Sequence, residues 1–379
     1  MIDFSEPLNG LINLVLLLAI LVVLVVIHEF GHFLVARRAG VRVHEFGIGF
    51  PPRARVLGND GETTYTLNWL PIGGFVRLEG EEGESDDPRS FVRQRLRTRL
   101  TILLAGVAMN FLLAFVIFAF IAALADPIVN VRVAVVEPNS PAAQIGLVGS
   151  QRLGTDGQGN VMYDQSGDVI VAIDGRTFPT FDRLDTQVPM LLYLREHAGQ
   201  PVTLTVQSAD GSTRDVAVTL RVPTGNQGAL GITVHPDLVT ADVRHDPLTA
   251  IVKGGQRTLE ASTLILRGVA GLVTNLANPP VAGPIGIVGT IGDLRAQLPP
   301  IFMLWFIGLL SANLAVINAL PFPPLDGGRV AVSLIQAVTS NRVSEAAERL
   351  VYLTGFILLM ALLAWVTLFD TGILQRSGI

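Results

Sequence analysis

The sequence predicts a polytopic α-helical membrane protein with about four transmembrane helices, a membrane-associated β-loop on the cytoplasmic side and an inserted α+β domain. Half of the 379 residues are hydrophobic and only 16% are charged, which is too apolar for an ordinary soluble domain. Several uncharged stretches are long enough to cross a hydrocarbon core of about 30 Å. Between them lie roughly 100 residues with the short, turn-separated strands of a soluble domain.

Four stretches are the expected membrane spans: residues 11–34, Leu100–Leu124, Leu298–Leu320 and Leu350–Phe369. A fifth uncharged stretch, Gly268–Gly292, contains six glycines and three prolines and is a poor continuous helix. We therefore expect the end of an amphipathic helix there, followed by a buried or re-entrant loop.

Arginines near the ends of the first two spans predict the orientation in the membrane. They are Arg37, Arg38, Arg42, Arg93, Arg95, Arg97 and Arg99. Because basic residues concentrate in cytoplasmic loops, the loop that carries them is expected in the cytoplasm. The N-terminus, the region 126–297 and the C-terminus would then lie outside. The first apolar run lacks a basic n-region and an A-x-A site, so we do not expect a cleaved signal peptide; a plain membrane anchor is the alternative to a functional span.

The composition also limits the chemistry. The net charge of −5 gives no global basic character, so no nucleic-acid partner is expected. The absence of cysteine excludes disulfides, thiol catalysis and cysteine-ligated zinc. A bound metal would need His, Asp or Glu ligands.

The motif His28-Glu29-Phe30-Gly31-His32 ends the first apolar stretch. Two histidines four residues apart lie on one helix face and can share a zinc ion, and Glu29 can accept a proton from the water that the metal activates. Ionisable groups at membrane depth are costly and usually functional. At ~1.5 Å per residue, His28 lies about 26 Å along the helix from Leu11, which places the metal below the cytoplasmic membrane surface.

A tetrahedral catalytic zinc needs a third protein ligand. Asp326 is the natural candidate because it follows the third span, after prolines that end the helix, and precedes Gly327 and Gly328, which let the backbone approach closely. A carboxylate at the membrane edge is best explained by a cation nearby. The predicted zinc ligands are therefore His28, His32 and Asp326.

Between the first two spans the pattern changes to β-structure. The run 47–52 breaks any helix, Thr63–Leu70 alternates like a strand, and Pro71–Val76 turns and resumes an extended conformation. We expect a small β-element close to the first helix, with an edge that can pair with an extended peptide.

The soluble region contains four predicted strands and a helix-like stretch at 181–197. The strands are Arg132–Val136, Val169–Ile173, Val202–Gln207 and Arg214–Thr219. After it, Leu248–Leu272 is amphipathic and is expected to lie on the membrane. The predicted organisation is a first part of the membrane core (1–125), the soluble domain (126–236), an amphipathic helix with a loop linker (237–297) and the second part of the core (298–379).

The chain resembles the site-2 protease family of intramembrane zinc metalloproteases. Residues 28–32 match its HExxH motif, and Asn318–Asp326 matches its N-x-x-P-x-P-x-x-D-G motif. Further segments that look like those of the family are 37–41, 47–50, 71–76, 104–110 and 283–287, so the resemblance covers nearly the whole chain. It is greatest for bacterial members that release a sigma factor by cutting its membrane-bound anti-sigma factor.

The resemblance implies Asp326 as the third ligand, Glu29 as the base and Asn318 as a donor to the scissile carbonyl or its oxyanion; Asn318 as a simple helix C-cap stays open. Expected substrate-binding residues are Gly47, Gly49, Gly73, Gly74, Phe75 and Asn313. The implied partners are membrane lipid and a single-pass membrane protein that another protease has already cut. The implied location is the bacterial inner membrane, and the oligomeric state is left open.

The soluble region resembles circularly permuted bacterial PDZ domains. Gly146-Leu147 and Gly167-Asp168 match landmarks of that fold, separated by an insertion at 148–166. Leu230, Gly231 and Ile232 resemble its carboxylate-binding loop, whose N–H groups could capture a peptide C-terminus. A domain that only shields the active site is the open alternative. Only one such domain is expected, where some family members carry two.

Two other functions fit parts of the pattern. A non-catalytic PDZ-bearing membrane scaffold would use the motif residues structurally, and it differs from a protease in needing neither Glu29 nor metal for its effect. A metal transporter would need polar residues along several spans, and the second and fourth spans offer almost none.

Overall fold

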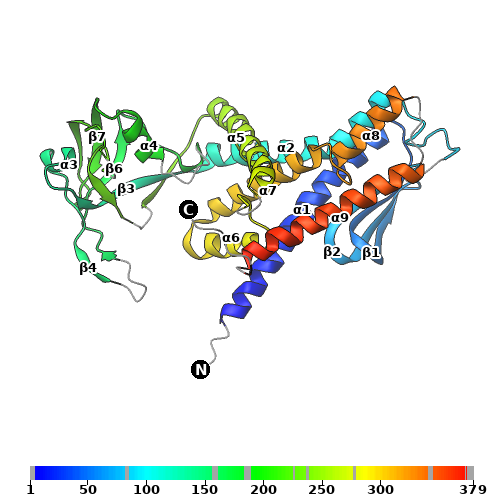
Figure 1. Cartoon of the computed structure of the whole chain (residues 1–379), viewed down its shortest axis with the longest axis horizontal. Helices are drawn as coiled ribbons and strands as arrows, with labels where there is room; N and C mark the ends of the chain where they lie inside the picture. The colour runs from blue at the N-terminus through cyan, green and yellow to red at the C-terminus, as the bar shows by residue number, and fades with distance from the viewer. Residues whose placement is uncertain are drawn as a thin grey trace. The chain divides into compact units, whose positions relative to one another are not determined.

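The computed structural model describes residues 5–81, 85–155, 161–182, 189–224, 227–235, 239–275, 279–339, 345–371 and 373. Figure 1 traces its helices and strands along the chain. The chain divides into two compact units. The first unit is built from the flanking parts of the chain, up to Phe118 and from Gly254 onwards, and the second is Ala119–Lys253.

Helices make up most of the first unit. They are α1 (Ser5–Arg38), α2 (Leu96–Leu124), α5 (Pro247–Thr274), α6 (Pro284–Gln297), α7 (Pro300–Ala319), α8 (Asp326–Val338) and α9 (Glu345–Asp370), with α2 and α5 continuing into the second unit. Four helices of the described chain are long and apolar enough to span a membrane: Leu8–Arg38, Leu96–Leu124, Pro300–Ala319 and Ala346–Asp370. The four predicted spans are confirmed as helices of sufficient length and apolarity.

The segment after α5 differs from the expected loop. Residues 276–278 lie outside the described residues, but Pro284–Gln297 forms α6, which begins at Gly283 with proline in its first turn. Two of the glycines that argued against a helix here, Gly286 and Gly292, allow close packing. A Cβ at Gly292 would lie 2.7 Å from the amide nitrogen of Asn13 on α1, and the N–H of Gly286 donates to Asp370 of α9 (3.0 Å).

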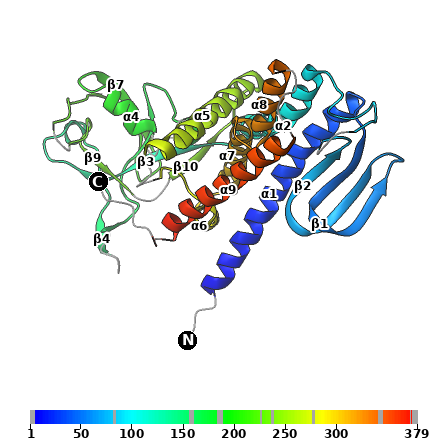
Figure 2. The ribbon, with the colours of Figure 1, turned by 45° about the vertical axis from the view of Figure 1, so that its right-hand side comes forward.

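The first unit also holds a curled antiparallel hairpin of β1 (Val43–Asn59) and β2 (Thr64–Leu78), which lies beside α1 (Figure 2). The first part of β1 pairs on both sides: Ile48 is opposite both Leu67 and Gly74. The segment 74–78 therefore forms one edge of this small sheet among the described residues. The expected β-element is present next to the first helix.

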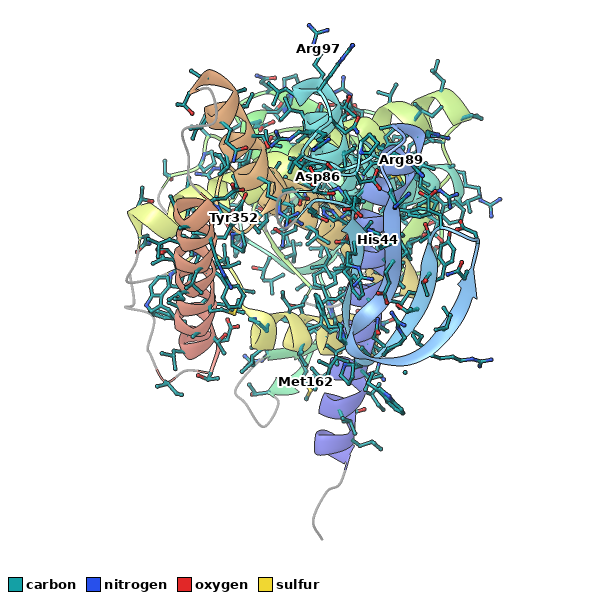
Figure 3. All side chains as sticks on the ribbon, turned by 90° about the vertical axis from the view of Figure 1, so that its right-hand side faces the viewer. His44, Asp86, Arg89, Arg97, Met162 and Tyr352 are labelled. Atoms are coloured by element: carbon teal, nitrogen blue, oxygen red, sulfur yellow. The ribbon has the colours of Figure 1, made fainter. Side chains whose placement is uncertain are left out.

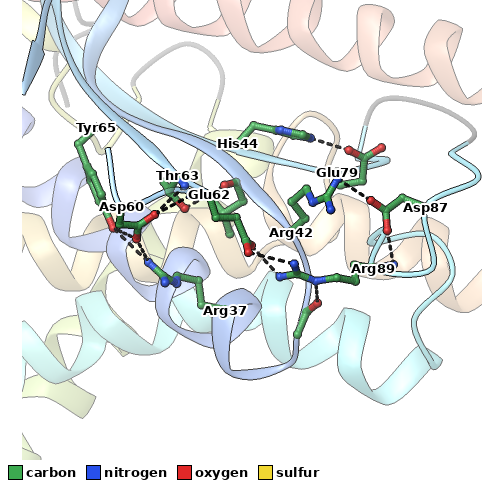
Figure 4. A network of polar contacts seen from close by, with 12 residues as sticks. Arg37, Arg42, His44, Asp60, Glu62, Thr63, Tyr65, Glu79, Asp87 and Arg89 are labelled. Carbon is green, nitrogen blue, oxygen red and sulfur yellow. Dashed lines mark hydrogen bonds and ion pairs between the residues drawn. The ribbon is translucent and has the colours of Figure 1, made fainter. Parts of the chain in front are cut away.

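One ion pair joins this hairpin to the end of α1, and three more connect the hairpin, the segment before it and the loop after it (Figure 4). The pairs are Arg37 with Asp60, Arg89 with Glu62 (2.6 Å), Arg42 with Asp87 (2.8 Å) and His44 with Glu79 (2.5 Å). The N–H of Thr63 and the Arg37 guanidinium lower the pKa of Asp60, and the Arg89 guanidinium lowers the pKa of Glu62. Both carboxylates thus stay charged at neutral pH, and acid below their lowered pKa values would release the network.

The second unit is a β-rich domain with short helices. Its elements are β3 (Asp126–Val136), α3 (Pro141–Gln144), β4 (Arg152–Thr155), β5 (Val161–Tyr163), β6 (Val169–Ile173), the 3-10 helix η1 (Thr180–Asp182), α4 (Pro189–Glu196), β7 (Pro201–Gln207), β8 (Thr213–Thr219), β9 (Ile232–Val234) and β10 (Val239–Val243). The main sheet has the order β10-β3-β6-β7-β8, and β9 also pairs with β3.

The four strands predicted for the soluble region correspond to β3, β6, β7 and β8. Their alternating apolar side chains form one core, with Val133, Ile170, Ile173 and Leu204 fully buried. The helix expected at 181–197 is present as α4; residues 183–188 lie outside the described residues. The insertion at 148–166 contributes the β4–β5 hairpin, of which 156–160 are likewise outside.

Candidate active site

The side chains of His28 and His32, both on α1, bring their Nε2 atoms together. His28 and His32 are 5% and 9% exposed, one helical turn apart, and their Nε2 atoms are 3.2 Å from each other. Their burial follows from the close approach of α1 and α2 at Gly31, where a Cβ would lie 2.4 Å from the carbonyl oxygen of Ala105. A glycine between the histidines therefore lets the second span cover them.

Asp326 joins them from the other end of the chain. It is the first residue of α8, and its Oδ2 lies 2.8 Å from His28 Nε2 and 3.3 Å from His32 Nε2. Gly327 makes this placement possible, because a Cβ there would lie 2.3 Å from the carbonyl oxygens of Ala319 and Leu320. The start of α8 is thus held against the end of α7, and the Asp326 carboxylate lies beside both histidines.

The donor set fits a zinc ion. Three ligand atoms that bind the same tetrahedral zinc at about 2.0–2.1 Å lie about 3.3 Å from one another. The triangle of His28 Nε2, His32 Nε2 and Asp326 Oδ2 has sides of 2.8, 3.2 and 3.3 Å. Two neutral imidazoles and one carboxylate are also ordinary zinc ligands. The fourth position of the tetrahedron is left for water or substrate.

Gly106 of α2 keeps this place open. A Cβ at Gly106 would lie 2.4 Å from His32 Nε2 and 2.6 Å from His28 Nε2, at the point where the ligand atoms converge. The sequence interpretation gave Gly106 no role. The available signal was a glycine inside the family-like segment 104–110 of an otherwise bulky apolar span.

Glu29 is near the same atoms. Its carboxylate offers an oxygen within 4.8 Å of the imidazole nitrogens. Glu29 and Asp326 are thus both candidates for the third ligand position, and the shorter Asp326 distances favour Asp326. A Cβ at Gly74 of β2 would be 3.7 Å from Glu29 Cγ. The base candidate therefore lies between the metal ligands and the edge of the small sheet.

The predicted substrate-binding glycines come together in the hairpin. Gly47 packs directly on the Phe75 ring, where a Cβ would approach it to 2.3 Å. Gly49 and Gly73 have φ of +78° and +73°, a conformation that side-chain-bearing residues rarely adopt. These positions shape the sheet edge beside Glu29.

Asn313 and Asn318 are half-buried on α7. Among the described residues, neither forms a hydrogen bond with the side chains of His28, His32 or Asp326. Their predicted roles toward substrate therefore stay predictions.

Two arginines anchor the helix that begins with Asp326. Arg329 of α8 pairs with Glu81 after β2, and Arg99 of α2 bonds Ser333 (3.0 Å) and Gln336 (3.2 Å) on α8. Sequence interpretation used Arg99 only for membrane orientation and did not single out Arg329. Their partners are distant in the chain, so no local pattern could have revealed these contacts.

The three residues expected to bind a peptide C-terminus lie together in the second unit. Leu230 is buried, Gly231 has φ of +77° and packs on Ser140, and Ile232 begins β9. The carbonyls of Leu230 and Gly231 accept from Ala142 and Glu137. Among the described residues, no acceptor is bound to the N–H groups of Leu230 and Gly231.

The chain is similar to known proteins over most of its length. The model of peptidase family M50 matches residues 16–362. A provisionally named zinc metalloprotease of Clostridium perfringens is 34% identical over 92% of this chain and 95% of its own length. Similarly named proteins of Clostridium acetobutylicum and Campylobacter jejuni are 32% and 29% identical, over 94% and 92% of this chain and 97% and 90% of their own lengths.

Proposed function

The chain belongs to peptidase family M50, and we propose that it is an intramembrane endopeptidase that cleaves within or near the transmembrane segment of single-pass membrane proteins. Its membership makes it a zinc metalloprotease and a multi-pass membrane protein. One observation carries the proposal: His28 and His32 of a membrane-spanning helix converge with Asp326 within 3.3 Å, next to Glu29.

The proposed roles follow from the chemistry of amide hydrolysis. Zinc, when bound by His28, His32 and Asp326, would polarise the attacking water and the scissile carbonyl. Glu29 accepts the proton of that water and delivers it to the leaving amine. The side-chain N–H of Asn318 donates to the carbonyl oxygen as negative charge develops there.

The small sheet would present the substrate in an extended form. A transmembrane helix hides its amides in internal hydrogen bonds, so it must unwind locally before it can be cut. The edge segment 74–78 next to Glu29 offers backbone groups that can pair with the unwound strand. An anti-sigma factor already shortened by another protease is the substrate class that the family resemblance suggests.

The second unit would act as a PDZ domain. Two features of the described residues support this. The N–H groups of Leu230 and Gly231 have no acceptor there, and the short strand β9 pairs there only with β3. A peptide C-terminus could bind these donors and extend the sheet at β9. We propose that residues 126–236 form this domain outside the inner membrane, linked through 237–297 to a core of 1–125 and 298–379.

The first test is Glu29→Gln in the full chain. We expect cleavage of a tagged single-pass membrane substrate to fall by at least about 100-fold, because the glutamine cannot accept a proton. Zinc content, measured by elemental analysis of the purified protein, should stay at the wild-type level. Asp326→Asn is the matched variant on the ligand side and should lower zinc content as well as cleavage.

Two results would contradict the proposal. Wild-type cleavage by Glu29→Gln, or wild-type cleavage after exhaustive chelation, would favour the non-catalytic scaffold instead. Unchanged zinc in Asp326→Asn would remove Asp326 from the ligand set.

A further inference from the structure

The buried amide of Asn110 lies behind the zinc-facing side of His28. Asn110 is on α2, is fully buried, and its side chain lies 3.3 Å from His28 Nδ1. His28 directs its other nitrogen, Nε2, at His32 and Asp326. The two nitrogens of one imidazole therefore have different partners, a ligand set on one side and a carboxamide on the other.

An imidazole that binds a metal through Nε2 is neutral and carries its proton on Nδ1. That N–H needs an acceptor, and the acceptor fixes both the tautomer and the plane of the ring. His32 meets this requirement through the carbonyl oxygen of Ile102, 2.7 Å from its Nδ1. His28 has the side chain of Asn110 in the equivalent position.

The orientation of the Asn110 amide decides whether it can accept the Nδ1–H of His28. With Nδ2 toward His28, the amide would donate to Nδ1, Nε2 would carry the proton, and the buried Oδ1 has no partner among the described residues. The two ends of a carboxamide have nearly the same shape, so hydrogen bonding decides between them. Turning the amide over places Oδ1 against Nδ1–H of His28 and leaves Nε2 with a free electron pair.

We propose that Asn110 is a positioning residue whose Oδ1 accepts Nδ1–H of His28 and so aims Nε2 at the zinc. This inference rests on the proposed role of His28 as a zinc ligand. Ser311 of α7 donates its hydroxyl to the backbone carbonyl of Asn110 (2.8 Å), a buried contact at the same helix crossing that does not involve the Asn110 amide.

The test compares Asn110→Leu with Asn110→Asp in the full-length protein in detergent. Leucine has a similar size but no acceptor, whereas aspartate keeps an acceptor and loses the donor. Zinc affinity is measured by competition with a chromogenic chelator. We expect Asn110→Leu to weaken zinc binding by about 10–100-fold, the usual effect of losing such a partner. Asn110→Asp should bind zinc at least as tightly as the wild type.

Ser311→Ala and His28→Ala are the controls. Ser311→Ala removes a buried hydrogen bond at the same helix crossing without touching His28, and it should keep wild-type zinc affinity. Equal losses in Asn110→Leu, Asn110→Asp and Ser311→Ala would mean a packing effect and would overturn the inference. If zinc affinity is unchanged in Asn110→Leu but falls in His28→Ala, the inference about Asn110 is overturned and the ligand assignment of His28 stands. Unchanged affinity in His28→Ala would overturn the ligand assignment first.

Discussion

At the scale of single residues, the site depends on glycines, which have no side chain, as much as on the residues that could bind zinc. The ligand atoms converge in a space that exists because α2 has a glycine at 106. Gly31 on α1 and Gly327 on α8 instead let neighbouring backbone segments approach closely. Glycine usually weakens a helix by about 1 kcal/mol relative to alanine, so its use here exchanges helix propensity for close approach.

Gly106→Ala tests this steric account. The added methyl group would lie 2.4 and 2.6 Å from the two imidazole Nε2 atoms, in the place where zinc would bind. We expect zinc affinity to fall by more than the ~10–100-fold that the loss of a ligand's hydrogen-bond partner causes. Chelator competition measures this. Gly289→Ala on α6 is the control, since nothing lies within 4 Å of a Cβ there, and its affinity should match the wild type.

At the scale of elements, the helix that begins with Asp326 is held from several directions. Gly328 packs on the backbone of Phe322 and Pro323, and Gly355 of α9 packs on the carbonyl of Pro323 from the other side. The fourth span, although most of its side chains are exposed, therefore contacts the turn that positions the third ligand. Its apolar composition alone gave no sign of this contact.

Gly355→Ala is expected to disturb this turn. The new Cβ would lie 2.0 Å from the Pro323 carbonyl oxygen, so α9 or the turn must move. Overpacking of this kind costs about 1–3 kcal/mol. The midpoint of thermal unfolding of the purified protein should fall, and zinc affinity should fall with it because Asp326 follows the turn. A midpoint equal to that of Gly289→Ala would show that α9 does not support the ligand.

At the scale of the whole molecule, the proposed function places the loop before α2 and the second unit on opposite sides of a membrane. Charged and polar side chains mark the expected cytoplasmic loop: Arg97, at the N-terminal end of α2, projects into solvent, and Asp86 and Arg89 lie in the loop before it (Figure 3). The second unit follows α2, so one span separates it from that loop in the chain. A single membrane crossing thus accounts for both predicted locations.

The absence of cysteine makes this topology directly measurable. Asp86→Cys and Ser212→Cys each introduce one thiol at an exposed position, in the loop before α2 and in the second unit. With intact bacterial cells, a membrane-impermeant maleimide should label Ser212→Cys only. After permeabilisation both should react. Labelling of Asp86→Cys in intact cells would reverse the proposed orientation.

Much of the architecture could be predicted because the bilayer imposes strong rules on sequence. Uncharged stretches of about 20 residues identify membrane helices with little ambiguity, and strand alternation identified β3, β6, β7 and β8. For Gly268–Gly292 the sequence correctly predicted the end of an amphipathic helix, α5, but it missed the helix α6, because glycine and proline count against a helix locally. Contacts with Asn13 and Asp370, distant in the chain, favour the helix there.

By itself the sequence determined the spanning helices, the pair His28 and His32, and Asp326 as the acidic residue whose position at the membrane edge is best explained by a nearby cation. Helical periodicity and the cost of charge near lipid are local properties, and they are readable from composition and spacing. The tertiary structure alone decided that Gly106 opens the metal position, that Asn110 lies behind His28, and that Arg99, Arg329 and Gly355 hold the turn and the helix of Asp326 in place. These depend on packing between helices that are far apart in the chain, and no local pattern encodes such contacts.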